Sequence, residues 1–128
     1  MPDSAYQPFG PARRPGNKPE DKPLYRVLVH RQYADLWAEL PQRVGLESAQ
    51  QCYDHLSRSP GVPSPINRTT VLVGRAGRPI AEGFSRTIHY EISGAGRINY
   101  QYNDAYTGGA ESDPHRVVFI LTIDLPSH

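Results

Sequence analysis

Five polar side chains in residues 86–103 have the types and the spacing to serve phosphate chemistry. A histidine and a carboxylate can exchange protons as acid and base, and an arginine can bind a phosphate through two parallel hydrogen bonds. Amide side chains can hydrogen-bond a ligand. Such a set acts together only if one element brings the five side chains to the same surface. They are His89, Glu91, Arg97, Asn99 and Gln101.

A β-hairpin would bring them together, because side chains alternate between the two faces of a strand. Isoleucine and tyrosine occupy the even-numbered positions of 88–92 and 98–102, and the polar side chains occupy the odd-numbered ones. Pairing residues whose numbers sum to 190 aligns the apolar faces and predicts Gly94-Ala95-Gly96 as a three-residue loop. This register sets Glu91 opposite Asn99. The polar face is the best candidate for a functional surface, and the alternative is the solvated outer face of any antiparallel sheet.

Arginines are concentrated just before and within this hairpin. Of the 14 Lys and Arg residues, four lie in residues 1–23, and the other ten are all Arg. Five of those ten lie between residues 66 and 98, where only two glutamates oppose them. Arginine is the better phosphate binder, so an Arg-rich segment beside the polar face could hold a nucleic-acid backbone. The alternative is an ordinary solvated surface.

The hairpin must be positioned by the other elements of the chain. Their predicted order indicates an α+β domain over residues 24–128, in which two N-terminal helices pack on a mainly antiparallel, four- to five-stranded sheet. Pro41 would clash inside a helix, so the first helix should end near Leu40 and Pro41 should open a turn or a second helix. The predicted elements are a strand over 24–29, helices over 33–40 and 46–58, a brief strand over 69–73, the hairpin, and a buried strand over 117–123.

The N-terminal residues 1–23 contain six of the thirteen prolines and few apolar residues. We expect an extended or disordered arm, either an unstructured leader or an arm that binds a partner. No apolar run is long enough for a membrane span, and the N-terminus does not resemble a secretory signal. With a single cysteine, Cys52, placed on an apolar helix stripe, we expect a cytoplasmic protein with a buried core thiol.

Several site classes have no matching motif in the chain. A phosphate-binding P-loop and a dinucleotide fingerprint are both lacking, and the five histidines have no metal-ligand spacing. We therefore expect neither a metal nor a cofactor. The net charge of +1 does not by itself point to nucleic acid.

The order of elements and the hairpin motif resemble the RelE/ParE superfamily of bacterial toxin–antitoxin toxins, over about residues 24–124. The matching features include a Gly-Arg step that opens the second hairpin strand and is followed by an apolar residue and, two positions on, a tyrosine. The segments that carry the resemblance are the opening strand Tyr25–Val29, a second helix ending in Leu56-Ser57-Arg58-Ser59-Pro60, the step Val71-Leu72-Val73-Gly74, the strand Ser85–Tyr90, Gly96-Arg97-Ile98-Asn99-Tyr100, and the last apolar strand.

The resemblance implies a toxin-like protein whose partners are a cognate antitoxin and either RNA on the ribosome or, in ParE-type members, DNA gyrase. RelE-type members are metal-independent endoribonucleases that cut messenger RNA by attack of the 2′-hydroxyl on the adjacent phosphate. Carried over, Arg97 would bind the phosphate, and His89 and Glu91 would act as acid and base. The same scaffold without this chemistry would be a gyrase inhibitor or a protein-interaction module, so whether the chain is an enzyme stays open.

The resemblance also assigns supporting roles and marks two differences. Five residues would hold the RNA: Arg75, Arg78, Arg86, Asn99 and Gln101. Relatives often place a catalytic tyrosine or histidine after the last strand, and His128 could stand in for it. RelE itself uses lysines in the first hairpin strand, whereas residues 24–128 contain no lysine.

Overall fold

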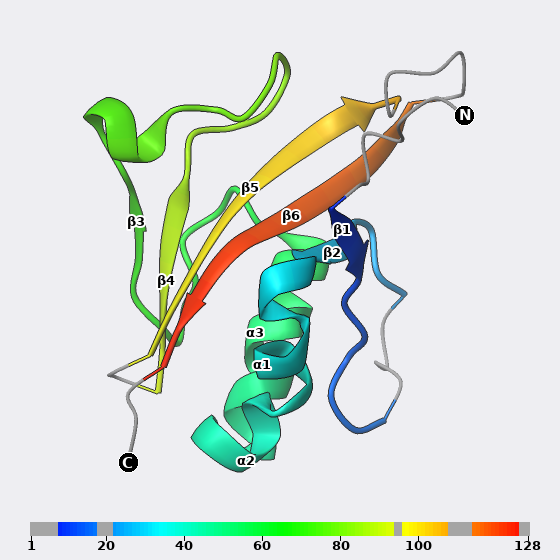
Figure 1. Cartoon of the computed structure of the whole chain (residues 1–128), viewed down its shortest axis with the longest axis vertical. Helices are drawn as coiled ribbons and strands as arrows, with labels where there is room; N and C mark the ends of the chain where they lie inside the picture. Colours follow the sequence, from blue (N-terminus) through cyan, green and yellow to red (C-terminus); the bar gives the residue numbers. More distant parts are fainter. Residues whose placement is uncertain (1–7, 18–21, 94–95, 108–113, 126–128) are drawn as a thin grey trace.

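The computed structural model describes residues 8–17, 22–93, 96–107 and 114–125 (Figure 1). Within these ranges, strands, α-helices and two 3-10 helices alternate along the chain. In chain order they are β1 (Phe9–Pro11), β2 (Arg26–His30), the 3-10 helix η1 (Arg31–Tyr33), α1 (Ala34–Ala38), α2 (Leu40–Val44), α3 (Leu46–Arg58), β3 (Thr69–Val71), the 3-10 helix η2 (Gly74–Gly77), β4 (Ile88–Ile92), β5 (Gly96–Tyr106) and β6 (His115–Asp124).

The strands form one six-stranded sheet in the order β1-β2-β6-β5-β4-β3 (Figure 1). Strands β2 and β6 pair in parallel, and every other neighbouring pair is antiparallel. A parallel pair needs a long crossover, which the helices and the three intervening strands provide. The predicted α+β class is therefore confirmed, but the sheet is mixed and has six strands instead of four or five.

The helical region is divided more finely than the apolar pattern predicts. The second predicted helix is confirmed as α3, which spans Leu46–Arg58. The first predicted helix is wrong as a single element, because its residues are shared among η1, α1 and the start of α2. Pro41 lies in the first turn of α2. Backbone N–H groups have no partner within the helix at this position, so the N–H that proline lacks costs the helix no hydrogen bond. Gly45, at φ 94°, makes the corner between α2 and α3.

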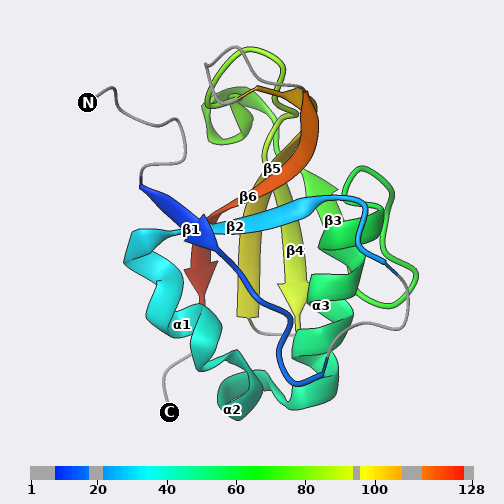
Figure 2. The same ribbon diagram turned by 90° about the vertical axis from the view of Figure 1, so that its right-hand side faces the viewer.

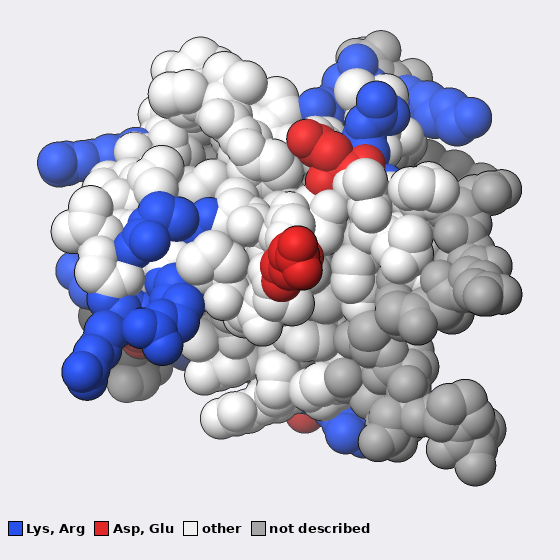
Figure 3. Space-filling view, turned by 90° about the horizontal axis from the view of Figure 1, so that it is seen from above, with Lys and Arg blue, Asp and Glu red and all other residues white. Residues whose placement is uncertain are grey.

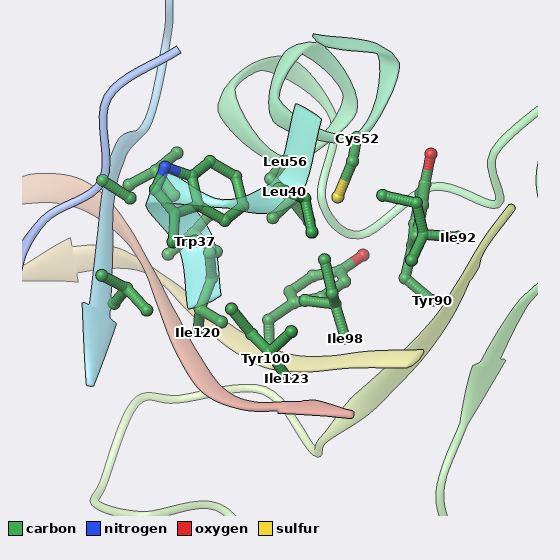
Figure 4. Close-up of a cluster of buried hydrophobic side chains, with 14 of the residues drawn as sticks. Trp37, Leu40, Cys52, Leu56, Tyr90, Ile92, Ile98, Tyr100, Ile120 and Ile123 are labelled. Atoms are coloured by element: carbon green, nitrogen blue, oxygen red, sulfur yellow. The ribbon is translucent and has the colours of Figure 1, made fainter. Parts of the chain in front are cut away.

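The helices cover one face of the sheet and enclose the main core (Figures 2 and 4). Alternate residues of β4 and β5 point into it, including Tyr90 and Tyr100, whose side chains are fully buried. Figure 4 shows Cys52 of α3 pointing toward the side chains of the sheet. Its thiol is buried and free, and burial raises its pKa, so the predicted core thiol is confirmed.

The predicted hairpin forms, but its predicted register is wrong by two residues. Paired residues sum to 188, which sets Glu91 opposite Arg97 and Ile92 opposite Gly96. A shift of two residues keeps every side chain on its face, so alternation alone does not choose between the two registers. In the observed one, Gly96 lies within β5, where an added Cβ would come 2.8 Å from Leu125 and 2.9 Å from Ile92. Of the predicted loop, residues 94–95 lie outside the described residues.

The described part of the N-terminal segment is extended and packs on the body. Its strand β1 pairs with β2 at the edge of the sheet. Arg14 then forms a two-pronged ion pair with Asp54 of α3, at 2.8 and 2.9 Å. The indole of Trp37 donates a hydrogen bond to the carbonyl of Arg13 at 2.8 Å. Ordering this segment costs conformational entropy, and its few apolar residues cannot offset that cost by themselves. The contacts with the body of the protein offset it.

A smaller apolar cluster lies on the opposite face of the sheet. It consists of Leu28, Phe84, Tyr106, Val117 and Phe119. Phe84 belongs to the connection between η2 and β4, which folds over this face at one end. Every helix of the described residues is too short or too polar to cross a bilayer.

Candidate functional site

The face of the sheet opposite the helices carries two rows of polar side chains, one beside the other, across β3, β4, β5 and β6. We call these two rows the polar face. Strand pairing aligns the members of each row, because residues directly opposite one another in an antiparallel sheet lie on the same face. The first row is Arg68, Glu91, Arg97 and Asp124, and the second is Thr70, His89, Asn99 and Thr122.

The second row is linked by hydrogen bonds. Asn99 donates from Nδ2 to Thr122 Oγ1 at 3.0 Å, so its Oδ1 is the acceptor for His89 Nδ1, also at 3.0 Å. This assignment puts a proton on Nδ1 of the histidine and leaves Nε2 as the nitrogen that can accept or release a proton. Asn99 therefore sets both the orientation and the tautomer of the His89 ring.

Charges alternate in sign along the first row. The guanidinium of Arg68 lies 3.8 Å from a carboxylate oxygen of Glu91. Arg97 is exposed and is flanked by Glu91 on β4 and Asp124 on β6. Two carboxylates beside one guanidinium lower the positive potential that Arg97 would otherwise present to a phosphate. The row is a balanced set of charges and not a cationic strip.

The three predicted catalytic side chains lie together on the polar face. His89 and Glu91 are two residues apart on β4, so they are separated by about 7 Å along the strand. Arg97 lies directly across from Glu91 on β5. A phosphate placed over these strands could contact Arg97 while the histidine and the carboxylate reach different sides of it. This arrangement can support proton transfer at both ends of a displacement at phosphorus.

Gln101 does not belong to the exposed part of this face, which corrects the prediction that it binds RNA there. Its side chain is fully buried beneath the segment that connects η2 to β4. Its Nε2 donates to the Arg78 carbonyl at 2.8 Å and to Thr87 Oγ1 at 2.9 Å, and its Oε1 accepts from the Ile80 amide at 2.9 Å. The sequence pattern misses this burial because the covering segment follows no strand or helix period.

The arginines before the hairpin have different surroundings. Arg86 donates hydrogen bonds to the carbonyls of Leu72 and Gly74, at 2.9 and 2.6 Å. Its guanidinium therefore stabilises the turn at η2. Arg75 and Arg78 are exposed, within or next to η2. Figure 3 shows Lys and Arg side chains gathered on the side of the molecule where η2 lies in Figure 1. Arg75, Arg78 and Arg86 do not belong to the two rows of the polar face.

Four members of the polar face are not predicted from the sequence: Arg68, Thr70, Thr122 and Asp124. A register shift between Asn99 and Tyr100, opposite residues 120–122 of β6, changes which residues of that strand point outward. Simple alternation along β6 therefore fails, and only the paired strand reveals the exposed positions. His128, the predicted stand-in for a residue after the last strand, lies outside the described residues.

The described residues contain no group of three or more histidine, cysteine, aspartate or glutamate side chains that could hold a metal ion.

Comparisons with protein-family models, with curated proteins and with solved structures returned no significant match.

Proposed function

We propose that this protein is a toxin-like endoribonuclease of the RelE/ParE type that binds and cuts RNA on the polar face. The observation that carries the proposal is the meeting of His89, Glu91 and Arg97 on neighbouring strands, opposite the helices. Acid, base and phosphate-binding groups are the parts that this reaction needs. The proposal places the protein in the bacterial cytoplasm, with a cognate antitoxin as its protein partner.

The order of elements in the sheet is compatible with the proposal. The first long strand, β2, lies parallel to the last, β6, and β5 and β4 continue the sheet in antiparallel fashion. The helices follow β2 directly in the chain and fill one face. The order of strand, helices and then further strands along the chain is the feature on which the resemblance to RelE/ParE toxins rests. The fold alone does not decide the chemistry, so the proposal depends on the polar face.

The proposed reaction is displacement at phosphorus by the neighbouring 2′-hydroxyl. Glu91 accepts the proton of the 2′-hydroxyl as its oxygen bonds to phosphorus. His89, as imidazolium with Nδ1 held by Asn99, gives its Nε2 proton to the departing 5′-oxygen as the P–O bond breaks. Arg97 stabilises the negative charge on the phosphate oxygens in the transition state. The products are a 2′,3′-cyclic phosphate and a 5′-hydroxyl, and no metal or redox partner is consumed.

Messenger RNA cleavage in a purified translation system, with and without ribosomes, tests this function. We expect the wild type to cut messages, and Arg97→Ala to lower the cleavage rate by about 100-fold, the order found when a single transition-state donor is removed. His89→Gln and Glu91→Gln should also be slow. Arg31→Ala, at an exposed position of η1, is the matched control and should cut like the wild type. Intact messages with the wild-type protein would reject the proposal.

A second candidate function is inhibition by binding, without RNA cleavage. The observation that favours it is the placing of Arg97 between Glu91 and Asp124, which leaves the first row without net charge. A ParE-like inhibitor of DNA gyrase would stay toxic after loss of His89 and Glu91, and its toxicity would follow loss of supercoiling activity.

A non-catalytic interaction module would be harmless when expressed and would form a stable complex with its partner.

A further inference from the structure

The outer edge of β3 presents backbone groups that no neighbouring strand covers among the described residues. β3 is the last strand of the sheet order and pairs only with β4. The amide of Glu91 donates to the Arg68 carbonyl, and the amide of Leu72 donates to the Thr87 carbonyl, both at 2.9 Å. Residues 68, 70 and 72 therefore face β4, and the peptide groups of 69, 71 and 73 point outward.

Apolar side chains accompany this open edge. Val71 is 55% exposed and Val73 is 82% exposed. Val73 continues the extended backbone of the strand, with φ −102° and ψ 168°. In the loop that precedes β3, Ile66 is 64% exposed. Proteins usually protect an edge strand with lysine, proline, a bulge or an inward charge, and residues 69–73 have none of these.

Residues of the edge and of its flanking loops carry only positive charge, although Glu91 of the neighbouring strand β4 lies beside Arg68. Residues 55–81 contain no aspartate or glutamate, but they contain Arg58, Arg68, Arg75 and Arg78. Arg68 precedes β3 with a side chain that is 79% exposed, and Arg75 follows the strand in η2 and is also exposed. A strand that pairs with this edge would therefore have a basic side chain near each of its ends.

We propose that the β3 edge binds an extended, acidic segment of a partner protein, which adds to the sheet as a seventh strand. Main-chain hydrogen bonds to residues 69, 71 and 73 would supply affinity, and apolar side chains at alternate positions would cover Val71 and Val73. Acidic residues at the intervening positions or at the ends would pair with Arg68 and Arg75. This edge shares Arg68 with the polar face, but it does not use His89, Glu91 or Arg97, and the proposal does not depend on the proposed ribonuclease function.

A second copy of this chain fits the edge less well. Symmetric antiparallel pairing of two β3 strands about Val71 would set Arg68 of one copy opposite residue 74 of the other, next to Arg75. The same contact would recur at the other end. Like charges in adjacent cross-strand positions destabilise a pair of strands. Charge therefore favours a different, acidic chain as the occupant.

Titration with a synthetic peptide tests the proposal. The probe is a fluorescein-labelled nonapeptide, Ser-Glu-Val-Glu-Val-Glu-Val-Glu-Ser, and the matched probe has lysine in place of each glutamate. We expect saturable binding of the acidic peptide to the full chain at low salt, weaker binding as salt is raised, and at least about tenfold weaker binding of the basic peptide. Amide exchange should slow at residues 69, 71 and 73. Equal binding of both peptides, or protection confined to other residues, would overturn the proposal.

Two substitutions of Val71 distinguish a loss of binding at the β3 edge from a loss of folding. Val71→Pro removes an outward N–H and leaves the bonds to β4 in place, since proline is tolerated at such a position of an edge strand. We expect about fivefold weaker peptide binding, as for one lost hydrogen bond. Val71→Thr keeps the N–H and should bind more tightly than Val71→Pro. A Val71→Pro protein that is folded and binds like the wild type would contradict the proposal.

Two further measurements separate partner binding from RNA cleavage and from self-association. RNA cleavage, if present, should be the same in Val71→Pro as in the wild type, so loss of one property does not imply loss of the other. Sedimentation at high protein concentration should show a monomer. A dimer that is lost in Val71→Pro would identify a second copy as the occupant and would refute the acidic-partner assignment.

Discussion

At the scale of single residues, His55 is a buried histidine whose Nε2 has no hydrogen-bond partner within the described part of the chain. The ring lies in α3 with its centroid 5.8 Å from that of Tyr90. Burial lowers the pKa of His55, and a hydrogen bond with the backbone of Val62 opposes this in part. The folded state therefore binds a proton less readily than the unfolded chain, in which histidine titrates near its ordinary pKa of about 6.5.

This difference gives the pH dependence of stability a definite sign. Well above pH 6.5 the ring is neutral in both states, and the burial of His55 has no pH-dependent cost. As the pH falls below that value, the unfolded state takes up the proton first, so the free energy of unfolding decreases. We expect His55→Phe to flatten this decrease between pH 7 and pH 5, measured by urea unfolding at each pH. His30→Asn, at a half-buried ring outside the core, is the control. An unchanged slope in His55→Phe would show that the acid sensitivity arises elsewhere.

At the scale of elements, a buried amide on β5 makes several of the hydrogen bonds that hold the segment from η2 to β4 on the sheet, beside those between Ser85 and Tyr102. Gln101 of β5 makes three hydrogen bonds to this segment. Gln101→Leu would leave the Ile80 amide and the Arg78 carbonyl without that partner, at a cost of about 2 kcal/mol in the free energy of unfolding. We expect faster exchange of the Ile80 amide proton, measured by NMR.

Gln50→Leu is the matched control, since Gln50 is half-buried and its Nε2 donates one hydrogen bond at 3.0 Å, to the Pro15 carbonyl. Its effect on stability should be smaller, about 0.5–1 kcal/mol. Equal effects of the two substitutions would mean that the Gln101 amide does not hold the segment in place.

The N-terminal segment is a second element whose position depends on particular side chains. The ion pair between Arg14 and Asp54 joins it to α3, with the Arg14 side chain only 16% exposed. Asp54→Ala should lower stability by about 1 kcal/mol, near the upper end for a partly exposed pair. It should also speed limited proteolysis within residues 8–17, measured by mass spectrometry of the fragments. Asp35→Ala, at an exposed position of α1, should leave the cleavage rate unchanged. Similar cleavage of both variants would assign the docking to the β1–β2 pairing alone.

At the scale of the whole molecule, the two faces of the sheet and its edges have different surroundings. The helices close one face over the main core, while the polar face stays open beside the segment from η2 to β4. One edge strand, β1, belongs to the docked N-terminal segment, and the other, β3, carries exposed apolar side chains. The proposed RNA site and the proposed partner site adjoin at Arg68, but their other key residues differ, so the substitutions Arg97→Ala and Val71→Pro separate them.

The sequence determined the class of the fold, helix α3, the buried thiol and the two faces of the hairpin. Each of these follows from a local period of apolar residues, which is fixed by the geometry of a helix or a strand. The same alternation put His89, Glu91 and Arg97 on one face, and the structure agrees.

Only the tertiary structure decided the register, the composition of the polar rows and the fate of Gln101. Registers that differ by two residues give the same faces, so the choice depends on how strands and loops pack around Gly96. The irregular pairing of β6 with β5 brings Thr122 and Asp124 into the rows of the polar face. The loop that covers Gln101 lies before β4, and is therefore separated from β5 in the sequence. These outcomes arise from contacts between distant parts of the chain, which no local pattern records.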